Sequence, residues 1–254
     1  MSRNVQSLER GLRVLEELVR HGPRGITEIS HELDLDKTIV HRLLGTLQAM
    51  GYVQQDSNRK YMVGVRLRQI GAKALSDLDL RTAALPYMQH LVEFTKGVAH
   101  LAKMAEYRAI YIEKVQHPGL PVKATDVGGE APGYCSAAGK VLWAHLSQLD
   151  LNSVMDKVEF RKHTENTITS PLELQSHLAR VREQGYARDN EEHRLGLNGI
   201  GVPVFDYTGT VVASMCVAAT ASQMNELGID EIVHQVLTAA QELSSELGYF
   251  NGNI

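Results

Sequence analysis

The chain has 254 residues, of which 43% are hydrophobic and 22% are charged, and its formal net charge is −4. These values are typical of a globular protein with a substantial core, in one large domain or two ordinary ones. No segment approaches the roughly 18 consecutive apolar residues of a membrane span, and the N-terminus lacks the apolar core of a signal peptide, so we expect no membrane contact and a cytoplasmic location.

Metal and disulfide chemistry is not indicated. The only two cysteines, Cys135 and Cys216, are far apart and not in a C-x-x-C spacing, which argues against a disulfide framework and a thiolate zinc site. The eleven histidines are scattered, with no H-x-x-x-H pair beside a third ligand. We therefore expect neither a bound metal nor a cofactor.

The charge is unevenly divided along the chain. Residues 1–78 contain 12 Lys and Arg against 9 Asp and Glu, whereas residues 79–254 contain 14 against 21. A basic front part on an acidic body fits a small nucleic-acid-binding module joined to a domain with another task.

Three helices are expected at the N-terminus. The first, in SLERGLRVLEELVRHG, has apolar residues at helical spacing and Ser7 as its N-cap. A short second helix begins with Thr27 as its cap. A third has Asp36 as N-cap, runs to Met50 and ends at Gly51 as C-cap.

A hairpin follows in YVQQDSNRKYMVG, which alternates at both ends and has the polar turn Asp56-Ser57-Asn58 at its centre, with Arg59 and Lys60 beside the tip. Three helices and a hairpin in this order predict a winged helix-turn-helix. The predicted domains are residues 1–65 (winged helix-turn-helix), 66–78 (linker helix) and 79–254 (second domain).

The second domain mixes strands and helices without regular βαβ alternation, which predicts an α+β fold with an antiparallel sheet. A helix over residues 80–97 opens it, with Pro86 inside that segment. Strands are expected at 98–106, 109–116, within 122–133, at 197–206 and at 210–220. Further helices are expected at 136–146, 151–160, 170–185 and 230–248.

The third helix has a polar, basic face on its first turns. Lys37, Thr38, His41 and Arg42 lie off its apolar stripe, and such donors suit the base edges and phosphates of the DNA major groove. We expect Arg42 to bind guanine and Lys37 and Thr38 to hold phosphates. A solvated helix face is the plainer alternative, but Gly45, costly inside a helix, fits a close approach of DNA or of a neighbouring element.

The segment GYCSAAGKV, residues 133–141, resembles a phosphate loop only superficially. Five residues separate Gly133 from Gly139, and Val141 follows Lys140, so the Walker spacing fails, as does a Ser-x-x-Lys dyad from Ser136. Two interpretations remain: a helix N-terminus close to a bound anion, and tight helix-sheet packing.

Acidic residues gather in GYARDNEEHRLGLNGIGVPVFD, residues 185–206. Asp189, Glu191 and Glu192 have no nucleophile, metal set or cofactor loop beside them, and GIGVPV lacks the third glycine of a dinucleotide fingerprint. We expect these acidic side chains to lie in a loop, solvated or structural.

These motifs together resemble the IclR family of bacterial transcription regulators over nearly the whole chain. The resemblance rests on SLERGLRVLEEL, ITEISHELDLDKTIVHRLLGTLQAMGYV, KYMVGVRL, CSAAGKVLWAHL, REQGYARDNEEHRLGLNGIGVPVFD and VVASMCVAA. It implies a winged-helix domain, a linker helix and a GAF-like effector domain that binds a small organic acid, in dimers or dimers of dimers on promoter DNA. YCSAAGKV, VREQGYARDNEEH and TITSP look closest to regulators of sugar-acid catabolism, such as that of 2-keto-3-deoxygluconate.

The resemblance also implies an effector site. It places Ala137 and Ala138 at the mouth of a helix, Asp189 across the pocket, a cation in Lys123, and three residues on the late strands where the family often has Cys and Ser. Those three are Gly199, Cys216 and Ala218. In the DNA helix, Ile39 replaces a hydroxyl residue common in the family.

We therefore expect a DNA-binding repressor, not an enzyme, whose promoter binding responds to a small carboxylate. Three alternatives are an activator of the same architecture, a hydrolase with Cys135 or Cys216 as nucleophile, and a DNA-binding architectural protein without a ligand. A reactive thiol needs a histidine partner and a lowered pKa, and the architectural protein conflicts with the size of the second domain.

Overall fold

The computed structural model describes residues 5–76, 79–121 and 124–250. The chain forms two compact units that divide between residues 78 and 79. Within the described ranges, no helix is both long and apolar enough to span a bilayer.

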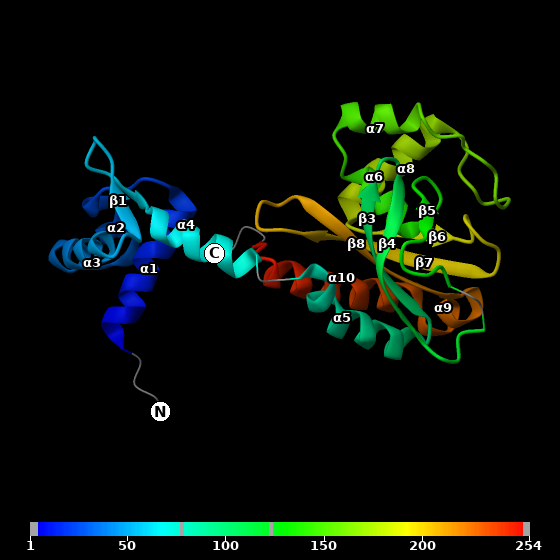
Figure 1. The fold of residues 1–254 in the computed structure, drawn as a ribbon, viewed down its shortest axis with the longest axis horizontal. Coiled ribbons are helices and arrows are strands. Elements are labelled where there is room, and N and C mark those ends of the chain that lie inside the picture. Colours follow the sequence, from blue (N-terminus) through cyan, green and yellow to red (C-terminus); the bar gives the residue numbers. More distant parts are fainter. Residues whose placement is uncertain (1–4, 77–78, 122–123, 251–254) are drawn as a thin grey trace. The chain divides into compact units, whose positions relative to one another are not determined.

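The first unit is a winged helix-turn-helix, as the sequence predicts (Figure 1). Its buried core joins the three helices to the hairpin and consists of Val14, Leu18, Ile29, Val40, Leu44, Val53 and Tyr61. The elements are α1 (Gln6–His21), α2 (Ile26–Leu33), α3 (Lys37–Ala49), β1 (Val53–Gln55), β2 (Tyr61–Val63) and α4 (Val65–Ser76).

Two predicted helix caps are wrong. Helix α1 begins at Gln6, two residues before the start that a Ser7 cap would give, because the carbonyl of Val5 already accepts the N–H groups of Leu8 and Glu9. Helix α2 begins after Gly25, whose N–H donates to the Glu28 carboxylate at 2.6 Å, so Thr27 lies inside the helix.

Helix α3 has the predicted N-cap. Asp36 accepts the N–H of Thr38 at 2.7 Å. The helix ends at Ala49, one residue before the predicted end, and Gly51 then turns the chain with φ +78°, a left-handed conformation that suits glycine.

The second unit is a six-stranded antiparallel sheet with helices on both faces, so the predicted α+β fold is confirmed. Its strand order is β5-β4-β3-β8-β7-β6. The strands are β3 (Val98–Ala105), β4 (Arg108–Gln116), β5 (Glu130–Pro132), β6 (Ala187–Asn190), β7 (Leu197–Phe205) and β8 (Val211–Thr220). The helices are α5 (Leu80–Thr95), α6 (Ala137–Ala144), α7 (Gln148–Met155), α8 (Pro171–Gln184), α9 (Ala221–Leu227) and α10 (Ile229–Glu246).

The helices form two layers around this sheet (Figure 1). Helices α5 and α10 cover one face, and α6, α7 and α8 cover the other. Two elements were not expected from the sequence, the edge strand β6 and the short helix α9. Helix α7 also stops at Met155 rather than near residue 160.

Close packing of α6 on the sheet depends on glycine. A Cβ at Gly201 of β7 would lie 2.8 Å from the Ala137 carbonyl oxygen and 3.2 Å from the Ala138 nitrogen. The start of α6 therefore lies directly over β7, which places its first turn at the site described next.

Candidate functional site

The first turns of α3 expose the side chains that the sequence singles out. Lys37, Thr38, His41 and Arg42 are all exposed, while Val40 between them is fully buried. The basic face is therefore free to meet DNA, because the opposite face seats the helix in its unit.

Two details qualify this surface. The Thr38 hydroxyl donates to Asp36 Oδ1 at 2.5 Å, so a contact with phosphate would compete with that hydrogen bond. Gly45 is exposed, and a Cβ there would meet no described atom within 4 Å. Packing inside the unit therefore does not explain this glycine.

The wing presents its two basic residues differently. Arg59 and Lys60 are both exposed at the hairpin tip, and Arg59 has φ +60°. Lys60 Nζ lies 3.6 Å from the Glu28 carboxylate of α2, so part of its charge is balanced within the unit. Arg59 makes no ion pair with any described residue.

A pocket opens in the second unit between the start of α6 and strands β3, β4, β6, β7 and β8. Its volume is about 80 Å³, whereas a single water molecule needs roughly 10–15 Å³ on the same scale. It therefore suits a small organic molecule. Six of the seven expected effector residues line it: Ala137, Ala138, Asp189, Gly199, Cys216 and Ala218. Lys123 lies outside the described residues.

Helix α6 presents its N-terminus to this pocket. Ser136 caps the helix by accepting the Gly139 N–H at 3.0 Å, and its carbonyl accepts the Lys140 N–H. The N–H groups of Ala137 and Ala138 have no hydrogen-bond partner among the described residues, and both alanines line the pocket. Such N–H groups, with the helix dipole, favour an anion.

Asp189 faces the same pocket from β6. Its Oδ1 accepts the N–H groups of Glu192 at 2.8 Å and His193 at 3.3 Å. Burial raises the pKa of Asp189 to about 7, with a further rise from Glu192, while Lys140 and the two N–H donors act in the opposite direction. Near neutral pH this carboxyl is therefore present in both its charged and its neutral form.

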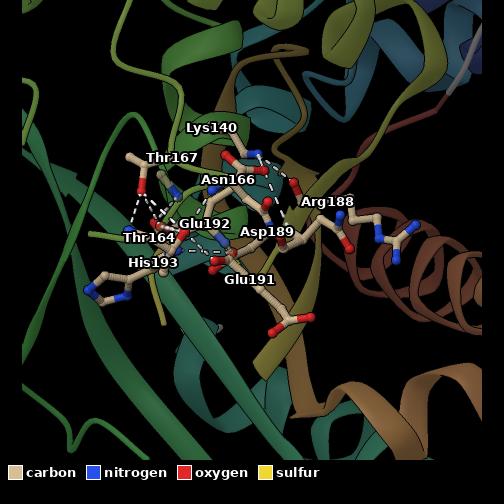
Figure 2. Close-up of polar contacts among 12 residues, drawn as sticks. Lys140, Thr164, Asn166, Thr167, Arg188, Asp189, Glu191, Glu192 and His193 are labelled. Carbon is tan, nitrogen blue, oxygen red and sulfur yellow. Dashed lines mark hydrogen bonds and ion pairs between the residues drawn. The ribbon is translucent and has the colours of Figure 1, made fainter. Parts of the chain in front are cut away.

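A buried ion pair lies behind Asp189 (Figure 2). Lys140 Nζ, from a side chain with no exposed surface, lies 2.5 Å from Glu192 Oε1 and also donates to the Arg188 carbonyl. Glu192 lies in a loop, as expected, and of the two alternatives, solvated and structural, it is structural, since its side chain is only 6% exposed. Asp189, which was expected in the same loop, lies in β6 instead.

Threonines fix the backbone of this acidic segment from the opposite side (Figure 2). Thr164 Oγ1 donates to the Glu191 carbonyl at 2.7 Å, and Thr167 Oγ1 donates to the Glu192 carbonyl at 2.7 Å. Residues 189–193 are thereby tied both to α6 and to the 164–167 loop.

Several pocket residues were not anticipated from the sequence. His100 of β3 stacks on Tyr111 of β4 with ring centroids 4.0 Å apart, and its Nε2 lies 2.8 Å from the Thr125 carbonyl oxygen. Burial lowers the pKa of His100 to about 4, so its imidazole is neutral at pH 7. Asn198 of β7 also lines the pocket, and its buried Oδ1 has no hydrogen-bond partner among the described residues.

Neither cysteine is activated. Burial raises the pKa of the Cys216 thiol to about 12 and raises the pKa of the Cys135 thiol well above its usual range. His100 lies opposite Cys216 across the β3–β8 pair but is not protonated at pH 7. Because thiolates are the reactive form, the hydrolase alternative finds no support. Over the described ranges, no cluster of three or more His, Cys, Asp or Glu residues could hold a metal.

Comparisons with known proteins cover both units. Residues 7–57 match the family described as "IclR helix-turn-helix domain", and residues 72–245 match "Bacterial transcriptional regulator IclR C-terminal". The chain is 35% identical over 247 residues to the HTH-type transcriptional regulator KdgR of Escherichia coli strain K12, covering 97% of this chain and 94% of that one.

Solved structures of other proteins have a similar fold. The crystal structure of the C-terminal domain of the E. coli regulator KdgR is 36% identical, with a TM-score of 0.61 over 68% of this chain and all of that domain. The Agobacterium tumefaciens repressor BlcR is similar in fold, with a TM-score of 0.82 and 22% identity over 98% of this chain and 100% of that chain.

Proposed function

The chain belongs to the IclR family of bacterial transcriptional regulators, and from this premise we propose that it is a cytoplasmic repressor that binds promoter DNA as a homodimer or dimer of dimers. A small organic acid in the pocket beneath α6 changes its affinity for the promoter. The observation that carries the proposal is that one chain combines an exposed basic turn on α3 with a pocket at a helix N-terminus.

DNA binding is assigned to α3 and the wing. Arg42 donates to a guanine in the major groove, Lys37 and Thr38 hold phosphates and set the register, and His41 lies on the same face. Arg59 and Lys60 contact the backbone from the wing. The exposure of these side chains and the burial of the opposite face of α3 support this assignment.

The effector is a small carboxylate, and we assign it to the class of sugar-derived hydroxy or keto acids. The N-terminus of α6 suits its carboxylate, which then lies beside Asp189, whereas Asn198 offers hydrogen bonds to a further polar group. The small side chains Gly199 and Ala218 leave space along the remaining wall. The pocket thus has polar groups at one end and open space at the other. It fits a small acid whose carboxylate lies at the polar end and whose short polar tail occupies the space.

An exposed apolar surface in the first unit fits contact with a second copy. Leu8, Leu12 and Met50 are 61%, 50% and 60% exposed, and they line a groove between α1 and α3. Contiguous apolar groups in water are typical of interfaces. Dimers also match two half-sites on DNA, because a two-fold axis repeats the recognition helix.

A gel-shift titration of the protein's own upstream region tests the DNA assignment. Arg42→Ala should weaken binding by about 5- to 150-fold, the equivalent of about 1–3 kcal/mol for one bidentate base contact. Arg180→Ala, an exposed arginine of the second unit, is the matched control and should bind as the unmodified protein does. Unchanged affinity of a folded Arg42→Ala protein would remove α3 as the recognition helix.

A thermal-shift series of sugar acids tests the effector assignment. An acid present at 100 times its dissociation constant adds about 2.7 kcal/mol of stability. The same acid should shift the gel-shift midpoint, since an effector acts only through different affinities for two states. An acid that stabilises the protein without changing DNA affinity would contradict the regulatory role.

A further inference from the structure

Asp189 stands out in the pocket because it is a half-buried acid at the place assigned to an anion. Ala137 and Asp189 both flank Gly199: a Cβ at residue 199 would lie 3.5 Å from the Ala137 Cβ and 3.6 Å from the Asp189 Cβ. An anion held by the first turn of α6 therefore lies beside the Asp189 carboxyl. Two adjacent carboxylates in a buried site do not both stay ionised.

Among the described residues, no buried cation lines the pocket to balance both negative charges. Lys140 is the buried cation nearby, and it is already paired with Glu192. Arg188 of β6 acts electrostatically on Glu192 as well, and Arg194, at the pocket, is exposed to solvent that screens its charge.

The other titratable side chains described around the pocket are neutral at pH 7. Burial lowers the pKa values of His100 on β3 and of His193 after β6 to about 4. Burial also raises the pKa values of Tyr111 on β4, of Cys216 on β8 and of Cys135 before α6 further above their ordinary values, which already lie above pH 7. Charge balance on binding an anion therefore falls to Asp189.

The geometry of Asp189 suits a protonated side chain. Its Oδ1 is occupied by two backbone N–H donors, so it acts as the acceptor oxygen. Oδ2 has no hydrogen bond with any described residue, and the residue lines the pocket. A proton on Oδ2 would point a donor at a ligand, while Lys140 and Glu192 hold the backbone that positions the group.

We propose that Asp189 binds the effector as a neutral carboxylic acid, donating from Oδ2 to the effector's carboxylate, so that binding to a protein with ionised Asp189 takes up one proton from solvent. The ionised acid and the ionised Asp189 combine with one proton, and the pocket then holds a carboxylate and a carboxylic acid. The inference rests on the proposed function, because it assumes an acidic effector in this pocket.

Affinity then depends on pH with a definite sign. In the free protein Asp189 titrates near pH 7, and the bound anion moves its pKa upward, so binding is strongest at low pH and weakens as pH rises through 7. Above that value the dissociation constant should rise about tenfold per pH unit, as linkage requires for one proton. Proton uptake should therefore be partial near pH 7 and approach one per site at higher pH.

Isothermal titration calorimetry of the full-length protein with 2-keto-3-deoxygluconate, followed by gluconate and galacturonate, provides the test. Phosphate and Tris have different heats of ionisation. The difference between the binding enthalpies measured in the two buffers at pH 8 therefore gives the number of protons taken up. Uptake close to one per site is expected. Binding without proton uptake would overturn the inference and leave the proposed function intact, whereas no binding by any of the acids would overturn both.

Two variants separate a donor from an acceptor. Asp189→Asn keeps the acceptor oxygen and replaces the acid proton by an amide donor, so it should bind without proton uptake, independently of pH, and at pH 8 at least as tightly as the unmodified protein. Asp156→Asn, at an exposed position after α7, is the control and should keep the pH dependence. Loss of binding in a folded Asp189→Asn protein would show that a charged acceptor is required and overturn the inference. If that variant does not fold, the two-buffer titration of the unmodified protein still decides.

Discussion

Replacing Lys140 by Met tests the buried ion pair behind the pocket. The Lys140 side chain is fully buried and its partner Glu192 is 6% exposed, with their charged atoms 2.5 Å apart. Glu192 Oε2 has no hydrogen-bond partner among the described residues, so without Lys140 this carboxylate keeps only the weaker effects of the Asn190 N–H and the Arg188 charge. Removing one member of such a pair typically costs about 3–5 kcal/mol, because it leaves a buried charge unpaired.

That loss is large for a domain of this size. Unfolding free energies of single domains are usually about 5–15 kcal/mol, and 1 kcal/mol shifts the melting temperature of a 150- to 250-residue domain by about 2–4 °C. Lys140→Met should therefore lower the melting temperature of the second unit by about 6–20 °C. Urea unfolding followed by circular dichroism should show a lower midpoint with an unchanged slope.

Two further variants make the reasoning refutable. The double variant Lys140→Met/Glu192→Gln leaves no buried charge and should recover most of the lost stability. Lys162→Met removes a lysine whose pair with Glu165, 2.6 Å apart, is largely exposed, and should cost little or nothing. A double variant as unstable as Lys140→Met would show that the loss comes from packing and not from an unpaired charge.

The same variant should show a pH dependence of defined sign. Burial already raises the pKa of Glu192 in the folded protein, and losing Lys140 raises it further. A group whose folded pKa lies above its unfolded value stabilises the protein below the unfolded pKa and loses that contribution as pH rises. The stability deficit of Lys140→Met should therefore be smaller at pH 5 than at pH 8, measured by urea unfolding at both.

Three other substitutions probe separate features. Gly201→Ala should destabilise the second unit by about 1–3 kcal/mol and weaken effector binding, because its Cβ would lie 2.8 Å from the Ala137 carbonyl oxygen; melting curves with and without effector check this. Gly45→Ala should instead stabilise the first unit by up to about 1 kcal/mol, and if DNA approaches this glycine closely, a gel shift will show weaker binding despite the added stability. Leu12→Lys should shift the protein toward monomer in analytical ultracentrifugation, and an unchanged oligomer would exclude the α1–α3 groove as the contact.

Local signals were sufficient to predict most elements of the fold. Helix α8 begins at Pro171 with Ser170 as its cap, and β7 and β8 pair across a short turn, as expected. Strand β6 was missed because ARDN is short and polar, and only its pairing with β7 makes it a strand. The caps at Ser7 and Thr27 were wrong because a hydroxyl residue near a helix start is a plausible cap at more than one position. The backbone geometry that fixes the first residue cannot be read from the sequence.

The candidate site was predictable only in part. Resemblance to a family brought Ala137, Asp189 and Cys216 together, although they are far apart in the sequence, and the structure places them in one pocket. Nothing local marks Lys140 as buried, because lysine is almost always exposed unless it is paired. Its partner lies 52 residues away, so the pair exists only once the sheet and α6 have assembled.

The ion pair and the pocket together give a physical route by which a ligand changes the second unit. An acid bound between Ala137 and Asp189 contacts the first turn of α6 and the end of β6 at once. Lys140 joins these two elements through the Arg188 carbonyl and the Glu192 carboxylate. Because packed elements shift between discrete arrangements rather than bend continuously, a ligand that fits only one spacing of α6 and β6 selects that arrangement. The free energy available for regulation is then the difference in affinity between the two spacings, which is the quantity that Lys140→Met should alter.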